Sequence, residues 1–288
     1  MLVVACIPGL IMQLPTFPSI PHAIAIDLDG TLLNSRTELT GRTRRALERC
    51  LEHGIPVIVA TSRPARIFNR IFPQDLARRC SYVLMNGALA VGNPPLSGNY
   101  RQALPQELLN GILDCARRLD ASVRITIEID GYEFGTNMPT DAATLWQRNS
   151  ATPDMVLTIE EASKRQPCKV ALGGADVVGL AECLAGEFGD SLSVVTNKLD
   201  RPILMVTTPD ATKPAALRKL LEPHGISLSE VLAFGDDLPD LEMLQACGTS
   251  VAMANAFPEV KAACAYHTAG NDEDGVAQVL EVMLGSTQ

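Results

Sequence analysis

The stretch AIAIDLDGT at residues 23–31 decides the fold of this 288-residue chain. Four apolar residues in a row indicate a strand buried on both faces, as in a parallel sheet. Two acids follow at once, Asp27 and Asp29, and then Gly30, at which the chain can turn sharply. Ligands of open parallel sheets bind at the carboxyl ends of the strands. The stretch therefore predicts a parallel sheet with a binding site at its edge.

Strands and helices alternate on both sides of this stretch along the chain. The apolar runs predict five further strands of the same sheet, at residues 56–60, 82–85, 203–206, 231–234 and 250–253. Helical patterns and caps predict the helices between and after them, at residues 40–53, 64–79, 212–224, 235–247 and 276–284. Repeated strand–helix units predict an α/β fold whose parallel strands are joined by right-handed crossovers.

The middle of the chain follows a different pattern. Residues 87–99 are rich in Gly, Pro and Asn, which predicts a linker. Residues 122–134 alternate with period two around Asp130-Gly131, a hairpin signal, and strands are also expected at 169–172 and 192–196. A stretch this long is not expected to be a loop. We predict an α+β domain at 89–199 inserted into a core of 21–88 and 200–288, with 1–20 as an N-terminal extension.

Composition and charge exclude several classes of protein. With 24 basic and 33 acidic residues the net charge is −9, which disfavours a general nucleic-acid binder. No apolar run reaches the roughly 20 residues that span a bilayer, so we expect a cytoplasmic protein without a membrane partner. The eight cysteines have no C-x-x-C spacing. We interpret them as reduced core residues and expect no zinc site, although counting alone leaves disulfides open.

The two acids after the first strand indicate phosphoryl chemistry. Asp27 and Asp29 repel each other at one strand end, and a hard cation such as Mg²⁺ would compensate them through oxygen ligands. Asp27 could then attack a phosphorus atom and form an aspartyl-phosphate. Asp29, two positions further on, could protonate the leaving oxygen and later activate water. The ordinary alternative is that Asp-Gly forms a turn in which both acids are exposed.

Three further clusters follow predicted strands. After the second strand, the hydroxyl of Thr61 and the helix-start amides could bind a phosphate oxygen. Lys213 begins a helix, where the dipole disfavours a cation, so an anionic partner such as Asp27 or a phosphoryl group is expected. Asp236, Asp237 and Asp240 supply more carboxylates than a helix cap needs. Each cluster also has an ordinary reading as a cap or a solvated charge, but together they match what phosphoryl transfer requires.

With these motifs the chain resembles the haloacid dehalogenase superfamily of phosphohydrolases, and within it the Cof-type branch. The resemblance covers about residues 22–284. It rests on DLDGTLL at 27–33, ATSRP at 60–64, NGA at 86–88, Lys213, Gly235-Asp236 with Asp240, AMANA at 252–256 and NDEDGV at 271–276.

The resemblance implies a Rossmann-like core with a parallel sheet and an inserted cap domain that selects the substrate. By position it makes Asp27 the nucleophile, Asp29 the acid/base and Lys213 the residue that stabilises phosphoryl charge. It places Mg²⁺ with Asp27, the backbone carbonyl of Asp29, and Asp236, while Asp240 would orient Lys213 or support the metal. Substrate and phosphate contacts are expected from Thr61, Ser62, Arg63, Asn86, Gly87 and Asn255.

The sequence departs from the pattern of this family at a few positions. Ser62 stands where the family usually has Gly, and Asp237-Leu238-Pro239 replaces the usual Gly-Met-Asn. Pro214 replaces a Gly after Lys213. None of these changes removes an expected catalytic group, but they alter the surroundings of the metal site.

The resulting expectation is a Mg²⁺-dependent phosphatase, monomeric or homodimeric, that hydrolyses a small phosphorylated metabolite. A sugar phosphate, a nucleotide and a phosphorylated cofactor all remain open. The alternatives are a phosphomutase that uses the same aspartate pair, and a non-catalytic protein that binds phosphometabolites. Within the inserted domain the candidates for substrate contacts are Arg124, Glu128, Arg148 and Lys198.

Overall fold

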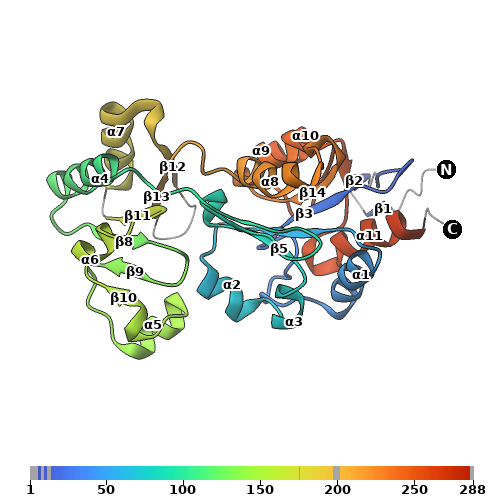
Figure 1. Ribbon diagram of the computed structural model, residues 1–288. Coiled ribbons are helices and arrows are strands. Elements are labelled where there is room, and N and C mark those ends of the chain that lie inside the picture. Colours follow the sequence, from blue (N-terminus) through green and yellow to red (C-terminus); the bar gives the residue numbers. More distant parts are fainter. Residues whose placement is uncertain (1–5, 8–9, 12–13, 175, 197–201, 286–288) are drawn as a thin grey trace. The chain divides into compact units, whose positions relative to one another are not determined.

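A computed structural model describes residues 6–7, 10–11, 14–174, 176–196 and 202–285, with side chains from residue 14 on (Figure 1). The chain forms two compact units, which we call unit 1 and unit 2. Unit 1 consists of Met1–Thr61, Ile71–Tyr100 and Lys213–Gln288, and unit 2 of Ser62–Arg70 and Arg101–Thr212. Four chain crossings therefore connect them.

Unit 1 is built on an eight-stranded sheet with the order β16-β15-β14-β3-β4-β5-β6-β7. The six strands from β16 to β5 are parallel to their neighbours, and β6 runs antiparallel to β5. Their bounds are β3 (Ala23–Asp27), β4 (Val57–Ala60), β5 (Ser81–Leu84), β6 (Leu89–Val91), β7 (Asn99–Arg101), β14 (Val231–Gly235), β15 (Thr249–Ala252) and β16 (Tyr266–His267). The short strands β1 (Cys6–Ile7) and β2 (Leu10–Ile11) pair separately.

Helices cover both faces of this sheet. In Figure 1, α8, α9 and α10 lie on one side of the strands, and α1 and α11 on the other. The helices of unit 1 are α1 (Gly41–Glu52), α3 (Gln74–Ala77), α8 (Lys213–Leu221), α9 (Leu241–Ala246), α10 (Pro258–Ala263) and α11 (Gly275–Gly285). Strands β3, β4 and β14 are buried along their whole length, as expected for strands covered on both faces. The predicted α/β class with a parallel sheet is confirmed.

Unit 2 contains a six-stranded, mostly antiparallel sheet with the order β10-β9-β8-β11-β13-β12. Its strands are β8 (Arg124–Glu128), β9 (Phe134–Thr136), β10 (Val156–Leu157), β11 (Lys169–Gly173), β12 (Ser193–Thr196) and β13 (Leu204–Thr207). Its helices are α2 (Ala65–Ile71), α4 (Gln106–Leu119), α5 (Ala142–Asn149), α6 (Ile159–Ser163) and α7 (Val177–Phe188). The last residue of α2, Ile71, is assigned to unit 1. Apolar side chains of α4, α7, β8, β11 and β13 form one buried core.

The borders of the units differ from the predicted domain borders. The sequence places the domain borders at 88/89 and 199/200, whereas the chain passes between the two compact units at 61/62, 70/71, 100/101 and 212/213; residues 199 and 200 lie outside the described part. The segment 87–99, expected to be a linker, instead carries β6 and the start of β7, and the N–H of Gly92 donates to Gly98 O. Its glycines and prolines lie in the turn between β6 and the edge strand β7.

Two secondary-structure expectations need correction. The strand expected at 203–206 in the parallel core is β13, which pairs antiparallel with β11 and β12 in unit 2. In the sequence, β13 followed by α8 (Lys213–Leu221) has the pattern of a βα unit, but β13 belongs to the sheet of unit 2 and α8 belongs to unit 1. The single helix expected at 64–79 is two helices, α2 and α3, because Pro73 between them has no N–H and starts a new helix.

The interpretation of all cysteines as reduced is also corrected. Cys115 of α4 and Cys183 of α7 form a disulfide. The two helices pack against each other on the same core, which brings the two side chains together. Cys50, Cys80, Cys168, Cys247 and Cys264 are free and buried. Among the helices of the described residues, none combines the length and apolar character that crossing a membrane requires.

Candidate active site

The candidate residues of unit 1 gather at the carboxyl ends of adjacent strands. Asp27 is the last residue of β3, and Asp236 follows β14, which pairs directly with β3. Later strands are added on opposite sides of this pair, so it is the topological switch point of the sheet. Open α/β sheets bind their ligands in the crevice at such a point. The order of the strands therefore places Asp27 and Asp236 where ligand chemistry is expected.

Lys213 joins two of the carboxylates. Its Nζ donates to Asp27 Oδ1 at 2.6 Å and to Asp240 Oδ1 at 2.6 Å. All three residues are buried, and the Lys213 side chain is 3% exposed. Lys213 is the first residue of α8, and these two carboxylates offset the unfavourable position of a cation at a helix start. Charge-assisted hydrogen bonds of this kind fix a buried side chain in one orientation.

Asp240 uses both of its oxygens within the protein. Besides Oδ1, which accepts from Lys213, its Oδ2 accepts from the backbone N–H of Asp236 at 3.1 Å and of Asp237 at 3.0 Å. Gly235 is part of this turn, because a Cβ there would lie 2.6 Å from Asp240 Cβ. Of the two roles expected for Asp240, the contacts favour orientation of Lys213 and of the Asp236 loop. Pro239 is exposed and leaves these bonds intact.

Thr31 and Gly30 shape the other side of Asp236. The Thr31 hydroxyl donates to Asp236 Oδ1 at 2.6 Å. Gly30 has a φ of +80°, and a Cβ at this position would lie 2.4 Å from Asp236 Oδ2. Thr31 belongs to the opening motif, but the sequence alone assigned it no role. A polar residue directly after Gly30 in the motif could have suggested a role for Thr31. Its partner Asp236 is 205 positions away in the sequence, so the hydrogen bond itself could not be predicted.

We expect Gly30→Ala to impair the Asp236 carboxylate specifically. A side chain at positive φ costs about 1–2 kcal/mol, and here the methyl group would also displace Asp236. Gly54→Ala is the matched control, because Gly54 has a φ of +72° with nothing within 4 Å of a Cβ. Thermal unfolding with and without Mg²⁺ measures both effects. Both variants should lose stability, but only Gly30→Ala should lose stabilisation by Mg²⁺; an equal Mg²⁺ response would contradict this assignment.

Negative charge is in excess in this cluster. One ammonium, that of Lys213, faces three carboxylates, and ligand atoms of Asp27, Asp236 and Asp240 lie within 4.8 Å of one another. Burial, reinforced by Asp240, raises the pKa of Asp27 well above its usual range. Burial likewise raises the pKa of Asp236 to about 6, despite the Thr31 hydrogen bond. For Lys213 burial acts against the charge, but Asp240 and Asp27 raise its pKa. A divalent cation with oxygen ligands fits such a donor set.

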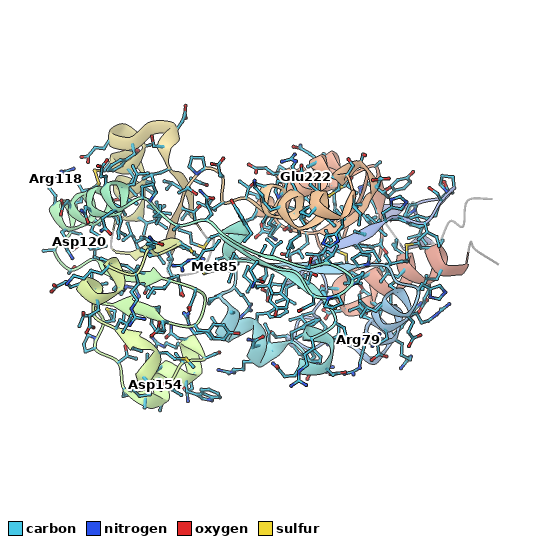
Figure 2. All side chains as sticks on the ribbon, in the orientation of Figure 1. Arg79, Met85, Arg118, Asp120, Asp154 and Glu222 are labelled. Carbon is cyan, nitrogen blue, oxygen red and sulfur yellow. A yellow bond between two sulfur atoms is a disulfide. The ribbon has the colours of Figure 1, made fainter. Side chains whose placement is uncertain are left out.

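Asn86 lies in a turn with unusual backbone geometry. Met85, labelled in Figure 2, has a φ of 53°, Asn86 of 60° and Gly87 of 104°. The Asn86 N–H donates to Thr61 O at 3.2 Å, which ties this turn to the expected phosphate-binding residue. Its Oδ1 is buried and has no hydrogen-bond partner among the described residues. Strained backbone and unpaired polar atoms concentrate at functional sites, so Asn86 remains a candidate for substrate contact.

Asn255 holds two loops together. Its Nδ2 donates to Gly30 O at 2.7 Å, and its Oδ1 accepts from the N–H of Asn271 at 3.1 Å. Both ends of the amide are therefore engaged with backbone, although the residue is exposed. These contacts favour a role in positioning the Gly30 turn over the expected contact with phosphate.

The remaining predicted residues are placed as follows. Asp29 is half-buried two residues after Asp27, and Thr61 is buried directly after β4. Ser62 and Arg63 are half-buried and belong to unit 2, where Ser62 O accepts a hydrogen bond from Lys169 Nζ. Of the substrate candidates in unit 2, Glu128 is buried in a bidentate pair with Arg66, and Lys198 lies outside the described residues.

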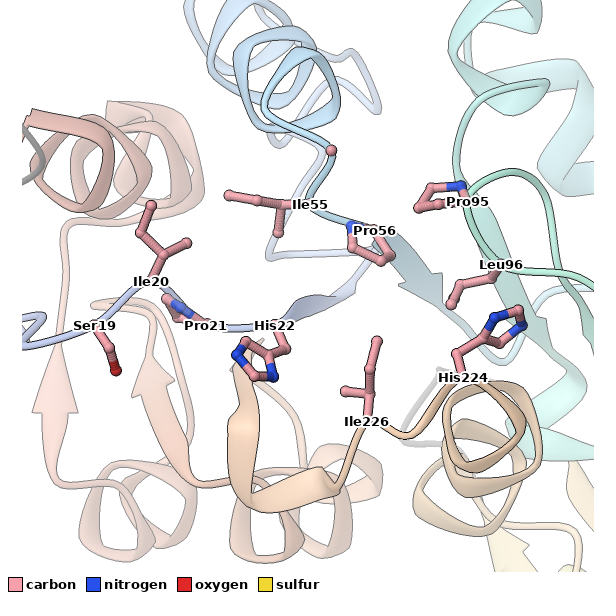
Figure 3. A pocket seen from close by; sticks show the side chains of 11 residues that line it. Ser19, Ile20, Pro21, His22, Ile55, Pro56, Pro95, Leu96, His224 and Ile226 are labelled. Atoms are coloured by element: carbon pink, nitrogen blue, oxygen red, sulfur yellow. The ribbon is translucent and has the colours of Figure 1, made fainter.

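A cavity of about 630 Å³ lies elsewhere in unit 1 (Figure 3). His22 and Pro56, which precede β3 and β4, line it together with His224 and Ile226. It is therefore at the amino ends of these strands, whereas the carboxylate cluster is at their carboxyl ends. None of the predicted site residues lines this cavity.

Comparison with known proteins agrees with this geometry. The sequence model of the haloacid dehalogenase-like hydrolase family matches residues 24–280. The chain belongs to this family. A 5-amino-6-(5-phospho-D-ribitylamino)uracil phosphatase of Bacillus subtilis is 26% identical over 91% of this chain and 97% of its own length. The HMP-PP phosphatase of Yersinia enterocolitica is 28% identical over 91% of this chain and 95% of its own.

Solved structures of the haloacid dehalogenase-like hydrolases share the fold. A hydrolase of this kind from Bacteroides thetaiotaomicron has a TM-score of 0.75 and 28% identity, covering 91% of this chain and 98% of that one. TM0651 from Thermotoga maritima has a TM-score of 0.74 and 27% identity, covering 91% and 97%. The resemblance inferred from the motifs is confirmed, and so is the prediction of a phosphatase of the haloacid dehalogenase type. Hydrolases of this family generally use a divalent metal, which agrees with the carboxylate cluster.

Proposed function

We propose that this haloacid dehalogenase-like hydrolase is a Mg²⁺-dependent phosphatase that acts on a small phosphorylated metabolite through an aspartyl-phosphate. The observation that carries the proposal is the buried contact of Lys213 with Asp27, beside Asp236. Asp27, Asp236 and the backbone at Asp29 would hold the metal. Bound there, Mg²⁺ would offset the negative charge of the carboxylates and of the phosphoryl group.

In the first step Asp27 attacks the phosphorus atom. Lys213 holds Oδ1 of Asp27, so we assign the attack to Oδ2. The bond from phosphorus to the ester oxygen breaks as the bond from Oδ2 to phosphorus forms, and Asp29 gives its proton to the departing alkoxide. The ammonium of Lys213 keeps Asp27 oriented and stabilises the charge that develops on the phosphoryl oxygens.

In the second step water releases the phosphate. Asp29, now ionised, takes a proton from a water molecule whose oxygen attacks phosphorus, and the bond from phosphorus to Asp27 Oδ2 breaks. Inorganic phosphate leaves, and Asp27 and Asp29 return to their starting states. Thr61 and the turn at Asn86 follow the neighbouring strands β4 and β5, and we assign them to the phosphoryl oxygens and the leaving group.

A panel of phosphate esters tests this function. With Mg²⁺ we expect release of one inorganic phosphate per alcohol formed from at least one sugar phosphate, nucleotide or phosphorylated cofactor. EDTA should abolish turnover, and added Mg²⁺ should restore it, because the carboxylate cluster then regains its compensating charge. Phosphate release is measured colorimetrically and the alcohol by chromatography.

The same panel separates the alternatives. An isomerised phosphosugar without free phosphate would identify a phosphomutase, which shares the aspartate pair. Binding of phosphate esters without Mg²⁺-dependent turnover would identify a non-catalytic binding protein. The substrates named for the relatives, phosphorylated ribitylaminouracil and HMP-PP, are the first members to include.

A further inference from the structure

Two sequence motifs, AMANA at 252–256 and NDEDGV at 271–276, take no part in the proposed reaction. Both lie in unit 1, and a hydrogen bond joins them. Asn255 of the first motif accepts at Oδ1 from the backbone N–H of Asn271 in the second, at 3.1 Å. The two turns that carry these asparagines are therefore in direct contact, next to the loop that carries Asp29.

The two asparagines hold that loop at two points. Asn255 Nδ2 donates to Gly30 O at 2.7 Å. Asn271 Nδ2 donates to Leu33 O at 2.9 Å. Asp29 is bonded to Gly30 and forms an isolated β-bridge with Leu33. Each side-chain amide therefore restrains a residue that is joined directly to Asp29.

Gly30 is the flexible point of this loop. Its φ of +80° is open to glycine, but without a side chain the residue can also adopt many other conformations. The bond from Asn255 fixes the carbonyl of Gly30 and with it the peptide plane that follows Asp29 by one residue. Precise placement matters for a catalytic group, because a shift of about 1 Å can lower a rate by about 100-fold.

The turn that carries Asn271 is itself anchored on its other side. Asp274, at the end of this turn, accepts hydrogen bonds from the hydroxyls of Thr40 and Thr43 at the start of α1. Helix α11 follows the turn and lies beside α1 (Figure 1). The asparagines therefore connect the loop of Asp29 to a packed pair of helices, which can restrain it.

We propose that Asn255 and Asn271 are positioning residues that hold Asp29 where it protonates the leaving oxygen. Both act through the backbone carbonyls of the loop and need no contact with the substrate. The inference deepens the proposed function and rests on it, because Asp29 is the acid of that reaction. It gives the motif at 271–276 a part in the first chemical step, 242 or more positions after Asp29 in the sequence.

Phenyl phosphates with different leaving groups test this inference. A poor leaving group such as phenolate needs the proton of the acid, whereas para-nitrophenolate departs readily without it. At saturating Mg²⁺, kcat/KM reports the steps up to departure of this group. Asn255→Ala and Asn271→Ala should each lower kcat/KM about 10–100-fold for phenyl phosphate, but less than about threefold for para-nitrophenyl phosphate. Loss of a direct contact with the phosphoryl group would lower both values equally.

Asn93→Ala is the matched control. Asn93 Nδ2 also donates to backbone carbonyls, those of Ala77 and Cys80, but Asn93 lies in the turn between β6 and β7. Its replacement should lower the melting temperature and leave the ratio of the two kcat/KM values as in the wild type. A purely structural role of Asn255 and Asn271 would give this same pattern in their variants.

Hydrogen exchange of peptides that cover residues 28–35 supplies a readout without turnover. Exchange there should be faster in Asn255→Ala and Asn271→Ala than in the wild type, and unchanged in Asn93→Ala. Equal losses of kcat/KM for both esters, or unchanged exchange in this loop, would overturn the inference. Faster exchange in the two variants, together with a wild type that hydrolyses no phosphate ester, would instead count against the proposed function.

Discussion

Replacement of Asp27 by Asn should lower kcat by about four orders of magnitude or more while the protein stays folded. The amide cannot form the phosphoenzyme, because its oxygen is a poor nucleophile. Lys213 can still donate to the amide oxygen, so the buried contact at 2.6 Å keeps one acceptor. Single-turnover assays with acid quenching measure both phosphate release and phosphate bound to the protein. Neither should be detectable in Asp27→Asn.

Asp237→Asn is the control for this result. Asp237 lies in the same acidic loop as Asp236, but it is exposed, and its Oδ1 accepts from the N–H of Leu238. The Asn side chain can make the same bond, so activity should stay within about threefold of the wild type. Substantial turnover by Asp27→Asn would remove Asp27 as the nucleophile, and an equal loss in Asp237→Asn would point to general damage of the loop.

Lys213→Met should have the largest effect on stability. It leaves Asp27 and Asp240 buried side by side without their shared ammonium. Loss of one partner from a buried ion pair costs about 3–5 kcal/mol, because the remaining charge has no compensation. We therefore expect the free energy of unfolding to fall by this amount in urea titrations without metal. Mg²⁺ should restore part of it, since the cation supplies the missing charge, but should not restore activity.

Lys219→Met provides the comparison within the same helix. Lys219 is an exposed residue of α8, and its replacement should change the free energy of unfolding by less than about 0.5 kcal/mol. If Lys213→Met unfolds at the same urea concentration as Lys219→Met, the contact with Asp27 and Asp240 does not stabilise the fold in solution.

The parallel core could be predicted from the sequence because its strands are buried on both faces. The run at 23–26 and the strand at 231–234 are continuous and apolar, and each ends in acids. The strand at 203–206 has the same local pattern, yet it lies in unit 2. Local patterns determine that a strand forms, whereas its partner strand depends on where the chain crosses between the units. The local sequence pattern does not indicate that the chain crosses to unit 1 only after residue 212.

The candidate site shows the same limit. The positions of Asp27, Lys213 and Asp236 followed from strand ends and from the helix dipole, which are local features. The role of Asp240 as acceptor from Lys213 and from two backbone amides depends on a turn geometry that the sequence does not specify. Asn255, expected at the phosphate, makes hydrogen bonds to backbone atoms of Gly30 and Asn271, two loops whose proximity the sequence does not reveal.

Residues 62–70 belong to unit 2 although they lie outside the long inserted segment 101–212. This limits how the inserted domain can be exchanged between related enzymes. Arg66 is 5% exposed, and its guanidinium is paired with Glu128. A chimera that imports residues 101–212 alone would place this arginine against a foreign surface without its carboxylate. A functional chimera must therefore exchange both segments of unit 2 together, the nine residues 62–70 and residues 101–212. Recombination between relatives should therefore preserve Arg66 and Glu128 jointly or lose them jointly.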